Sequence, residues 1–66
     1  MTHEIEVLYL LRGNYVSRKF MEIPPDKSFA MMEATAKKMR AEKKETLIIL
    51  RFKKDEDYYL INSIRT

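Results

Sequence analysis

The spacing of apolar and polar residues changes twice along the chain and divides it into three segments. Residues 4–23 are rich in β-prone side chains on both sides of the pair Gly13-Asn14. Glycine accepts a positive φ without a Cβ clash and asparagine tolerates the left-handed region, so this pair is typical of a two-residue hairpin turn. The first segment is therefore predicted to be a β-hairpin, in a register that places Val7 opposite Phe20.

The register of this hairpin decides which of its side chains share a face. One face is predicted to carry Ile5, Val7, Tyr9, Leu11, Val16 and Phe20, and the other Leu8, Leu10, Met21 and Ile23. Because side chains alternate along a strand, a slip of one residue would exchange the two faces.

The second segment begins after Pro24-Pro25, where proline ends the strand because it cannot donate to a ladder. Residues 27–44 contain no glycine or proline and are rich in good helix formers, so they are predicted to form a helix. Asp26 or Ser28 is predicted to cap this helix. The spacing i, i+3, i+7, i+10 predicts one narrow apolar stripe, formed by Phe29, Met32, Ala36 and Met39.

The third segment, residues 46–64, predicts a second hairpin. Residues 46–52 are mostly apolar with β-branched side chains in the middle, residues 53–57 form a charged turn, and residues 58–64 return as another strand. The resulting order is β-β-α-β-β.

This order predicts an α+β fold with one domain over residues 1–66. Its four-stranded, mainly antiparallel sheet would carry one helix packed on one face. A right-handed crossover favours the strand order 2-1-3-4. The alternative is a sheet in which the two hairpins are reversed in position.

The strand predicted over residues 47–52 is apolar on both faces. Ile48, Leu50 and Phe52 point one way, while Leu47 and Ile49 point the other. A single helix covers only one face, and a large exposed apolar patch is uncommon on a monomer. We therefore expect a partner-binding sheet face formed by Leu8, Leu10, Leu47, Ile49 and Ile61, with Met21 as a further candidate.

Two arrangements would cover such a face. A second copy related by two-fold symmetry is the preferred one, and it predicts a homodimer. The alternative is a strongly twisted sheet in which tyrosine side chains partly shield Leu47 or Ile49.

Composition excludes most catalytic chemistry. The chain has 66 residues, no cysteine and one histidine, His3, which we interpret as a solvated residue at a frayed terminus. Disulfides, thiolate catalysis and multi-histidine metal sites are excluded, and no glycine-rich phosphate loop is present. No catalytic residue, metal or cofactor is predicted, so an enzyme is not expected.

The basic excess lies in one part of the chain. The net charge is +3, and acidic and basic residues balance over residues 1–22 and over residues 45–66. The excess comes chiefly from a basic cluster formed by Lys37, Lys38, Arg40, Lys43 and Lys44. Such a cluster can bind phosphates or an acidic protein surface, although cations also complement the negative end of a helix dipole.

The combined interpretation is a small non-enzymatic protein-binding module, a regulator or inhibitor that covers a partner surface. The alternative is a nucleic-acid-binding protein that uses the basic cluster. An acidic N-terminus without a signal pattern and the lack of an 18-residue apolar run predict a complete cytoplasmic protein that does not bind a membrane. Complete proteins of this size are frequent among phage and mobile-element accessory genes.

Overall fold

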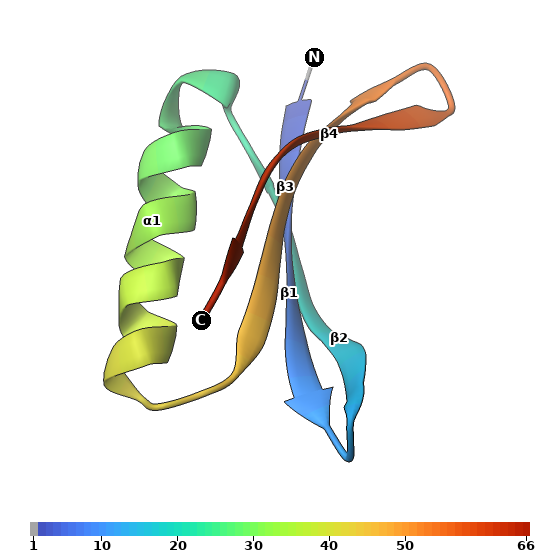
Figure 1. The fold of residues 1–66 in the computed structure, drawn as a ribbon. Coiled ribbons are helices and arrows are strands. Elements are labelled where there is room, and N and C mark those ends of the chain that lie inside the picture. The colour runs from blue at the N-terminus through green and yellow to red at the C-terminus, as the bar shows by residue number, and fades with distance from the viewer. Residues whose placement is uncertain (1) are drawn as a thin grey trace.

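The computed structural model describes residues 2–66 and contains four strands and one helix (Figure 1). Their bounds are Thr2–Leu11 (β1), Asn14–Ile23 (β2), Pro25–Ala41 (α1), Thr46–Lys54 (β3) and Asp57–Arg65 (β4). The strands form one antiparallel sheet in the order β2-β1-β3-β4. The predicted α+β class, the β-β-α-β-β order and the strand order 2-1-3-4 are therefore confirmed.

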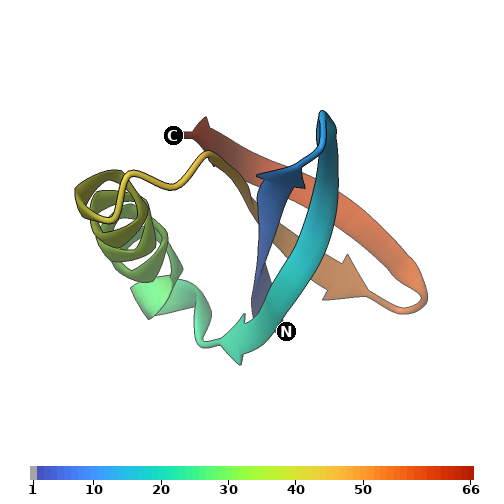
Figure 2. The same cartoon turned by 90° about the horizontal axis from the view of Figure 1, so that it is seen from below.

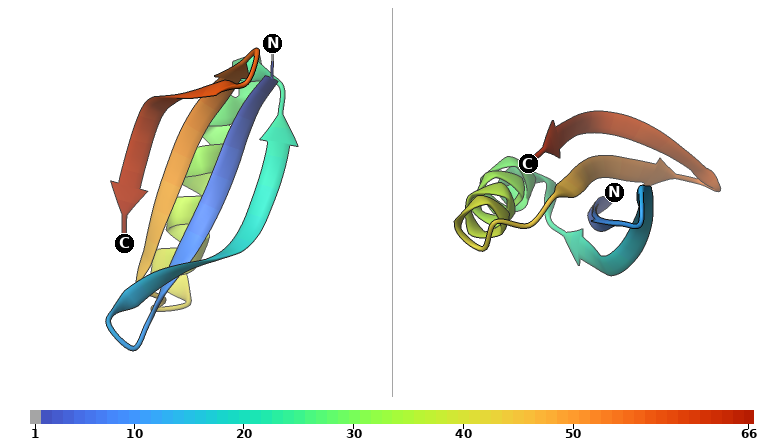
Figure 3. Two further views of the ribbon diagram at one scale, coloured as in Figure 1. Left: turned by 90° about the vertical axis from the view of Figure 1, so that its right-hand side faces the viewer. Right: turned by 60° about the horizontal axis from the view of Figure 1, so that its bottom comes forward.

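The helix lies across the two central strands, β1 and β3, on one side of the sheet (Figures 1 and 3). The core between helix and sheet consists of Ile5, Val7, Ile23, Met32, Ala36, Met39, Ile48 and Leu50. Half-buried Tyr9, Met21, Ile61 and Ile64 pack against it. Within residues 2–66, no helix is long and apolar enough to cross a membrane.

The first hairpin turns one residue earlier than predicted. Leu11 pairs with Asn14, so the loop residues are Arg12 and Gly13 rather than Gly13 and Asn14. Their φ angles are 50° and 83°, and two positive φ angles in succession are typical of a type I′ turn. This turn matches the right-handed twist of the strands and stabilises the hairpin despite the arginine at its first loop position.

A β-bulge then changes the register within the same hairpin. Leu8 pairs with Ser17, but Val7 pairs with Lys19, so Arg18 is an extra residue on β2. A bulge inserts one unpaired residue and therefore exchanges the faces of all residues beyond it.

This exchange corrects the predicted faces of β2. Phe20 lies opposite Glu6, on the side away from the helix, whereas Met21 packs against the core and Ile23 is buried. The prediction that Phe20 shares a face with Val7 was wrong. The charged residues Arg18 and Lys19 interrupt the apolar alternation at this bulge, so the change of phase could not be read from the spacing of apolar residues.

The helix begins at Pro25, with Pro24 in the N-cap position and no side-chain cap hydrogen bond. The prediction that Asp26 or Ser28 caps the helix was wrong. Proline at the first helical position has its φ preset and removes one of the N–H groups that the start of a helix leaves without an intrahelical partner. The buried helix face consists of Ser28, Met32, Ala36 and Met39, whereas Phe29 is half exposed instead of in the core.

Ser28 is buried because it contacts His3. The Ser28 Oγ lies 2.8 Å from His3 Nδ1 and donates to the Pro25 carbonyl at 2.9 Å. His3 is only 9% exposed, so its interpretation as a solvated terminal residue was wrong. The reason is topological: β1 lies between β2 and β3, and the first residues of β1 are covered by the N-terminal turn of α1.

The helix ends at Ala41, three residues before the predicted end. The N–H of Lys43 donates to the Arg40 carbonyl at 3.1 Å, and the N–H of Lys44 donates to the Met39 carbonyl at 2.9 Å. These two bonds, with a φ of 55° at Lys43, form a Schellman motif. The left-handed residue at position 43 is what ends the helix.

Replacing Lys43 with glycine is expected to stabilise the fold by about 1 kcal/mol, because glycine adopts a positive φ without a Cβ clash. Urea unfolding followed by circular dichroism measures this change. The matched control is Lys38→Gly in the exposed helix interior, which is expected to cost about 1 kcal/mol. Equal losses at the two positions would contradict the left-handed conformation.

Candidate functional site

The side of the sheet opposite α1, which we call the open face, is covered by no helix or strand of residues 2–66. Both hairpin turns curve away from the helix toward this side (Figures 2 and 3). Strand register and alternation place on it Glu4, Glu6, Leu8, Leu10, Tyr15, Phe20, Leu47, Ile49, Arg51, Lys53, Tyr58, Leu60 and Arg65.

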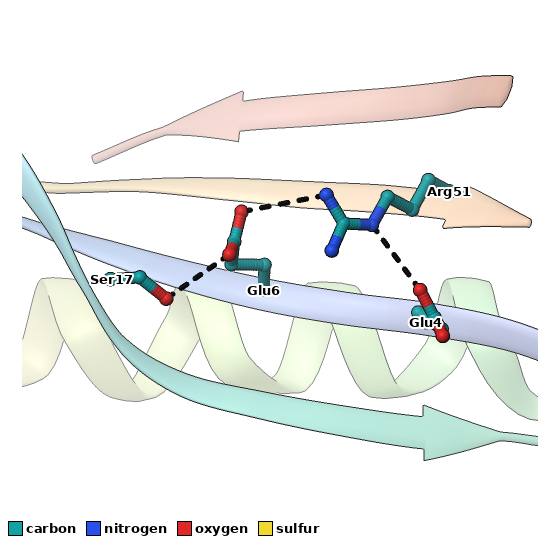
Figure 4. A network of polar contacts seen from close by, with 4 residues as sticks. All are labelled: Glu4, Glu6, Ser17 and Arg51. Carbon is teal, nitrogen blue, oxygen red and sulfur yellow. Dashed lines mark hydrogen bonds and ion pairs between the residues drawn. The ribbon is translucent and has the colours of Figure 1, made fainter. Parts of the chain in front are cut away.

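Arg51 is the centre of a polar network on the open face (Figure 4). Its Nε lies 3.3 Å from Glu4 Oε2 and its Nη1 lies 3.7 Å from Glu6 Oε1. Ser17 Oγ donates to Glu6 Oε2 at 3.1 Å. The Glu4 side chain is 5% exposed and the Arg51 side chain 24%. Two carboxylates on β1 thus hold the guanidinium of β3 in one position, and the guanidinium compensates a buried charge.

Aromatic side chains from both edge strands lie against the same guanidinium. The Arg51 Cζ is 4.5 Å from the centre of the Tyr58 ring and 5.3 Å from the centre of the Phe20 ring. Cations at such distances are attracted to the face of an aromatic ring. Phe20 and Tyr58 are each 48% exposed, and Leu60, which pairs with Arg51, is 69% exposed. We call Phe20, Arg51, Tyr58 and Leu60 the Arg51 cluster.

Four of the five predicted partner-binding residues lie together on the open face. Leu8 pairs with Leu47, and Leu10 and Ile49 are their neighbours on β1 and β3. We call Leu8, Leu10, Leu47 and Ile49 the aliphatic quartet; all four are half buried.

The chain itself shields part of the aliphatic quartet. Tyr15 of β2 is opposite Leu10, and Arg65 of β4 is opposite Leu47. The Arg65 Cζ lies 5.8 Å from the centre of the Tyr15 ring, so the two edge side chains meet across the face. This contact corresponds to the shielding by tyrosine in a twisted sheet. The large apolar side chains that remain exposed on the open face are Phe20, Tyr58 and Leu60 of the Arg51 cluster.

Ile61 does not lie with the quartet, contrary to its prediction as a sheet-face residue. Leu50 pairs with Asn62 and Arg51 pairs with Leu60, so Ile61 is the extra residue of a second bulge. It packs against the core. Leu60 takes the place on the open face that the regular alternation had given to Ile61.

The five residues of the basic cluster are exposed but are not brought together. Lys37 and Arg40 line one flank of α1 beside β4, and Lys38 is one helical step of about 100° away from Lys37. Lys44 pairs with Glu42 at 3.4 Å and lies 5.4 Å from the Tyr9 ring centre. The cluster is therefore divided: Lys37 and Arg40 lie on one flank of the helix, Lys38 lies off that flank, and Lys43 and Lys44 lie in the turn after the helix.

The described residues show no cluster typical of a metal site. Among residues 2–66, no group of three or more histidine, cysteine, aspartate or glutamate side chains could hold a metal ion. The open face combines exposed aromatic and aliphatic side chains with an arginine fixed by two carboxylates. Comparison of the chain with protein-family models, with curated proteins and with solved structures finds no match.

Proposed function

We propose that this chain is a small non-enzymatic protein-binding module, a regulator or inhibitor that covers a partner surface with its open face. The observation that carries the proposal is the Arg51 cluster: Phe20, Tyr58 and Leu60, each about half exposed or more, surround one arginine on a sheet face without a covering layer.

The composition of this cluster suits binding. Tyrosine and arginine are enriched among the residues that contribute most to protein interfaces. An arginine usually loses side-chain freedom when it enters an interface, and that loss opposes binding. Glu4 and Glu6 already restrict Arg51 in the free chain, so less freedom remains to be lost.

A second copy of the chain is the first partner we propose for this face. Chains of this size have thin cores, and association through a shared apolar surface adds to their stability. A two-fold dimer would place the same exposed residues of both copies against each other.

The proposal predicts that the wild type dimerises between micromolar and millimolar concentrations in sedimentation equilibrium. Phe20→Glu and Ile49→Glu are expected to remain folded and monomeric, because each introduces a charge on the open face. Met31→Glu is the matched control, since Met31 is a 40% exposed apolar residue of the helix. A monomeric wild type that also captures no protein partner sensitive to Phe20→Glu would refute the proposal.

Nucleic-acid binding by the basic cluster is the second candidate. It is supported by the free cations on α1: within residues 2–66, only Lys44 of the cluster takes part in an ion pair. It predicts oligonucleotide binding that weakens steeply with salt. Because the basic residues are divided among separate parts of the helix and the turn after it, they form a less suitable binding surface than the open face.

A further inference from the structure

The two edges of the sheet differ in how they are protected. β2 has the bulge at Arg18, and Arg18, Lys19 and Glu22 place charges along its edge. Bulges and edge charges are the devices that prevent a sheet from pairing with another chain. β4 has a bulge at Ile61, and its Ser63 N–H donates to Asn62 Oδ1 at 2.8 Å. Residues 58–64 nevertheless contain no charge, no proline and no glycine. The edge of β4 is therefore the less protected of the two and the one we consider for an additional strand.

A groove runs beside this edge. The helix packs on β1 and β3 and leaves β4 outside its main contacts. The groove has a volume of about 480 Å³. Its lining consists of Glu33, Ala34, Ala36, Lys37 and Arg40 of α1 and Ile64 of β4. A strand added to β4 would direct every second side chain toward the helix side, and so into this groove.

The groove has an apolar floor and a positive rim. Buried Ala36 and half-buried Ile64 provide the floor, exposed Ala34 lies beside them on the helix, and the small alanines leave room for a side chain. Lys37 and Arg40 outnumber Glu33 at the rim, and neither has an ion-pair partner among residues 2–66. The charge of the rim favours an acidic occupant.

We infer that the edge of β4 binds an extended acidic segment of a partner protein as a fifth strand. Backbone hydrogen bonds to the free edge give affinity, and side chains in the groove give specificity. On the helix side of the bound strand, an apolar side chain fills the groove between Ala36 and Ile64. The next side chain on that side is a carboxylate that pairs with Lys37 and Arg40.

This inference rests on the proposed protein-binding function but uses a surface apart from Phe20 and Ile49. The two are therefore separable by experiment. If β4 binds nothing while Phe20→Glu still abolishes dimerisation, the inference is wrong and the proposed function stands.

The test uses nine-residue peptides, the length of β4, with threonine at odd positions and valine alternating with glutamate at even positions. Two comparison peptides carry glutamine or lysine in place of glutamate. In fluorescence anisotropy, the glutamate peptide is expected to bind about tenfold more tightly than the lysine peptide, which corresponds to about 1.4 kcal/mol. Amide NMR shifts are expected along β4 and on the Lys37 flank of α1.

Charge reversal on the protein provides the second arm. Lys37→Glu/Arg40→Glu is expected to weaken binding of the glutamate peptide about tenfold. The matched control Lys27→Glu/Lys38→Glu makes the same change of charge at exposed helix positions away from the groove and is expected to leave binding unchanged. Circular dichroism of both variants shows whether the helix is intact.

Several results would overturn the inference. These are binding of none of the peptides at millimolar concentration, amide shifts confined to β2 or the open face, and equal loss of binding in the two double variants. Amide shifts of β4 that depend on protein concentration alone would assign the edge to a second copy. A single-stranded oligonucleotide that binds through Lys37 and Arg40 when no peptide binds would assign the flank to nucleic acid.

Discussion

Replacing Arg51 with leucine is expected to lower the free energy of unfolding by about 3 kcal/mol, the lower end of the cost of breaking a buried ion pair. The lower end applies because the Arg51 side chain remains 24% exposed. Without the guanidinium, the nearly buried Glu4 carboxylate has no compensating charge, and Glu6 lies two residues away on the same face. A domain of this size has only about 3–10 kcal/mol of stability, so a large fraction would be lost.

Urea unfolding of Arg51→Leu, followed by circular dichroism, measures this loss. Lys53→Leu is the matched control, because Lys53 lies on the same face, 5.6 Å from the Tyr58 ring centre, and takes part in no ion pair among residues 2–66. It is expected to cost less than about 1 kcal/mol.

A second substitution tests the cause of the loss. Glu4→Gln in the Arg51→Leu background is expected to recover part of the stability, since a buried neutral amide costs less than a buried unpaired carboxylate. If Arg51→Leu costs no more than Lys53→Leu, or if Glu4→Gln lowers the stability of Arg51→Leu further, the network is not what stabilises this part of the sheet.

The fold could be predicted from sequence because the spacing of apolar residues differs between its helix and its strands. The class and the strand order follow from local features alone. These are the two hairpins, the charge-rich helical segment and the proline pair that separates the first hairpin from the helix. The apolar faces of β3 were also predictable, because Ile48 and Leu50 alternate with Leu47 and Ile49 in an uninterrupted strand. Where a strand has no bulge, a period of two is sufficient to assign faces.

The candidate site could not be predicted in full because both bulges lie in it. The bulge at Arg18 moves Phe20 onto the open face, and the bulge at Ile61 moves Leu60 there in place of Ile61. None of the four residues of the Arg51 cluster was among the predicted sheet-face residues: Phe20 was assigned to the opposite face, and Arg51, Tyr58 and Leu60 were omitted. Arg51 is far in sequence from Glu4 and Glu6, and only the pairing of β1 with β3 brings it to them.

His3 was missed for a related reason. Position along the chain indicated a frayed end, but position in the sheet decides burial, and β1 is central from its first residues.

The basic cluster shows the opposite error, in which closeness in sequence was taken for closeness in space. Its residues are close in sequence, but a helix rotates successive side chains by about 100°, so proximity in sequence did not produce one surface.

The adjacent residues Ile48 and Ile49 provide the sharpest test of how the two sheet faces differ. Ile48 is completely buried between sheet and helix, and Ile48→Ala is expected to cost about 2–5 kcal/mol through lost burial and the cavity left behind. Ile49 is half buried on the open face, and Ile49→Ala is expected to cost about 1 kcal/mol in the monomer. Both substitutions remove the same atoms from the same strand, so the loss of β propensity cancels between them.

Protein concentration turns this pair into a test of the proposed function. If a second copy covers the open face, association stabilises the wild type by mass action, and dilution lowers its unfolding midpoint. The cost of Ile49→Ala should then increase with protein concentration, whereas the cost of Ile48→Ala should remain nearly constant. Urea unfolding of both variants at micromolar and near-millimolar protein separates burial within one copy from burial by a second copy.

A cost of Ile49→Ala that equals that of Ile48→Ala at every concentration would mean that the open face is as enclosed as the core, which contradicts the fold. A small, concentration-independent cost would instead mean that no second copy covers Ile49, because burial in a dimer must appear in the stability.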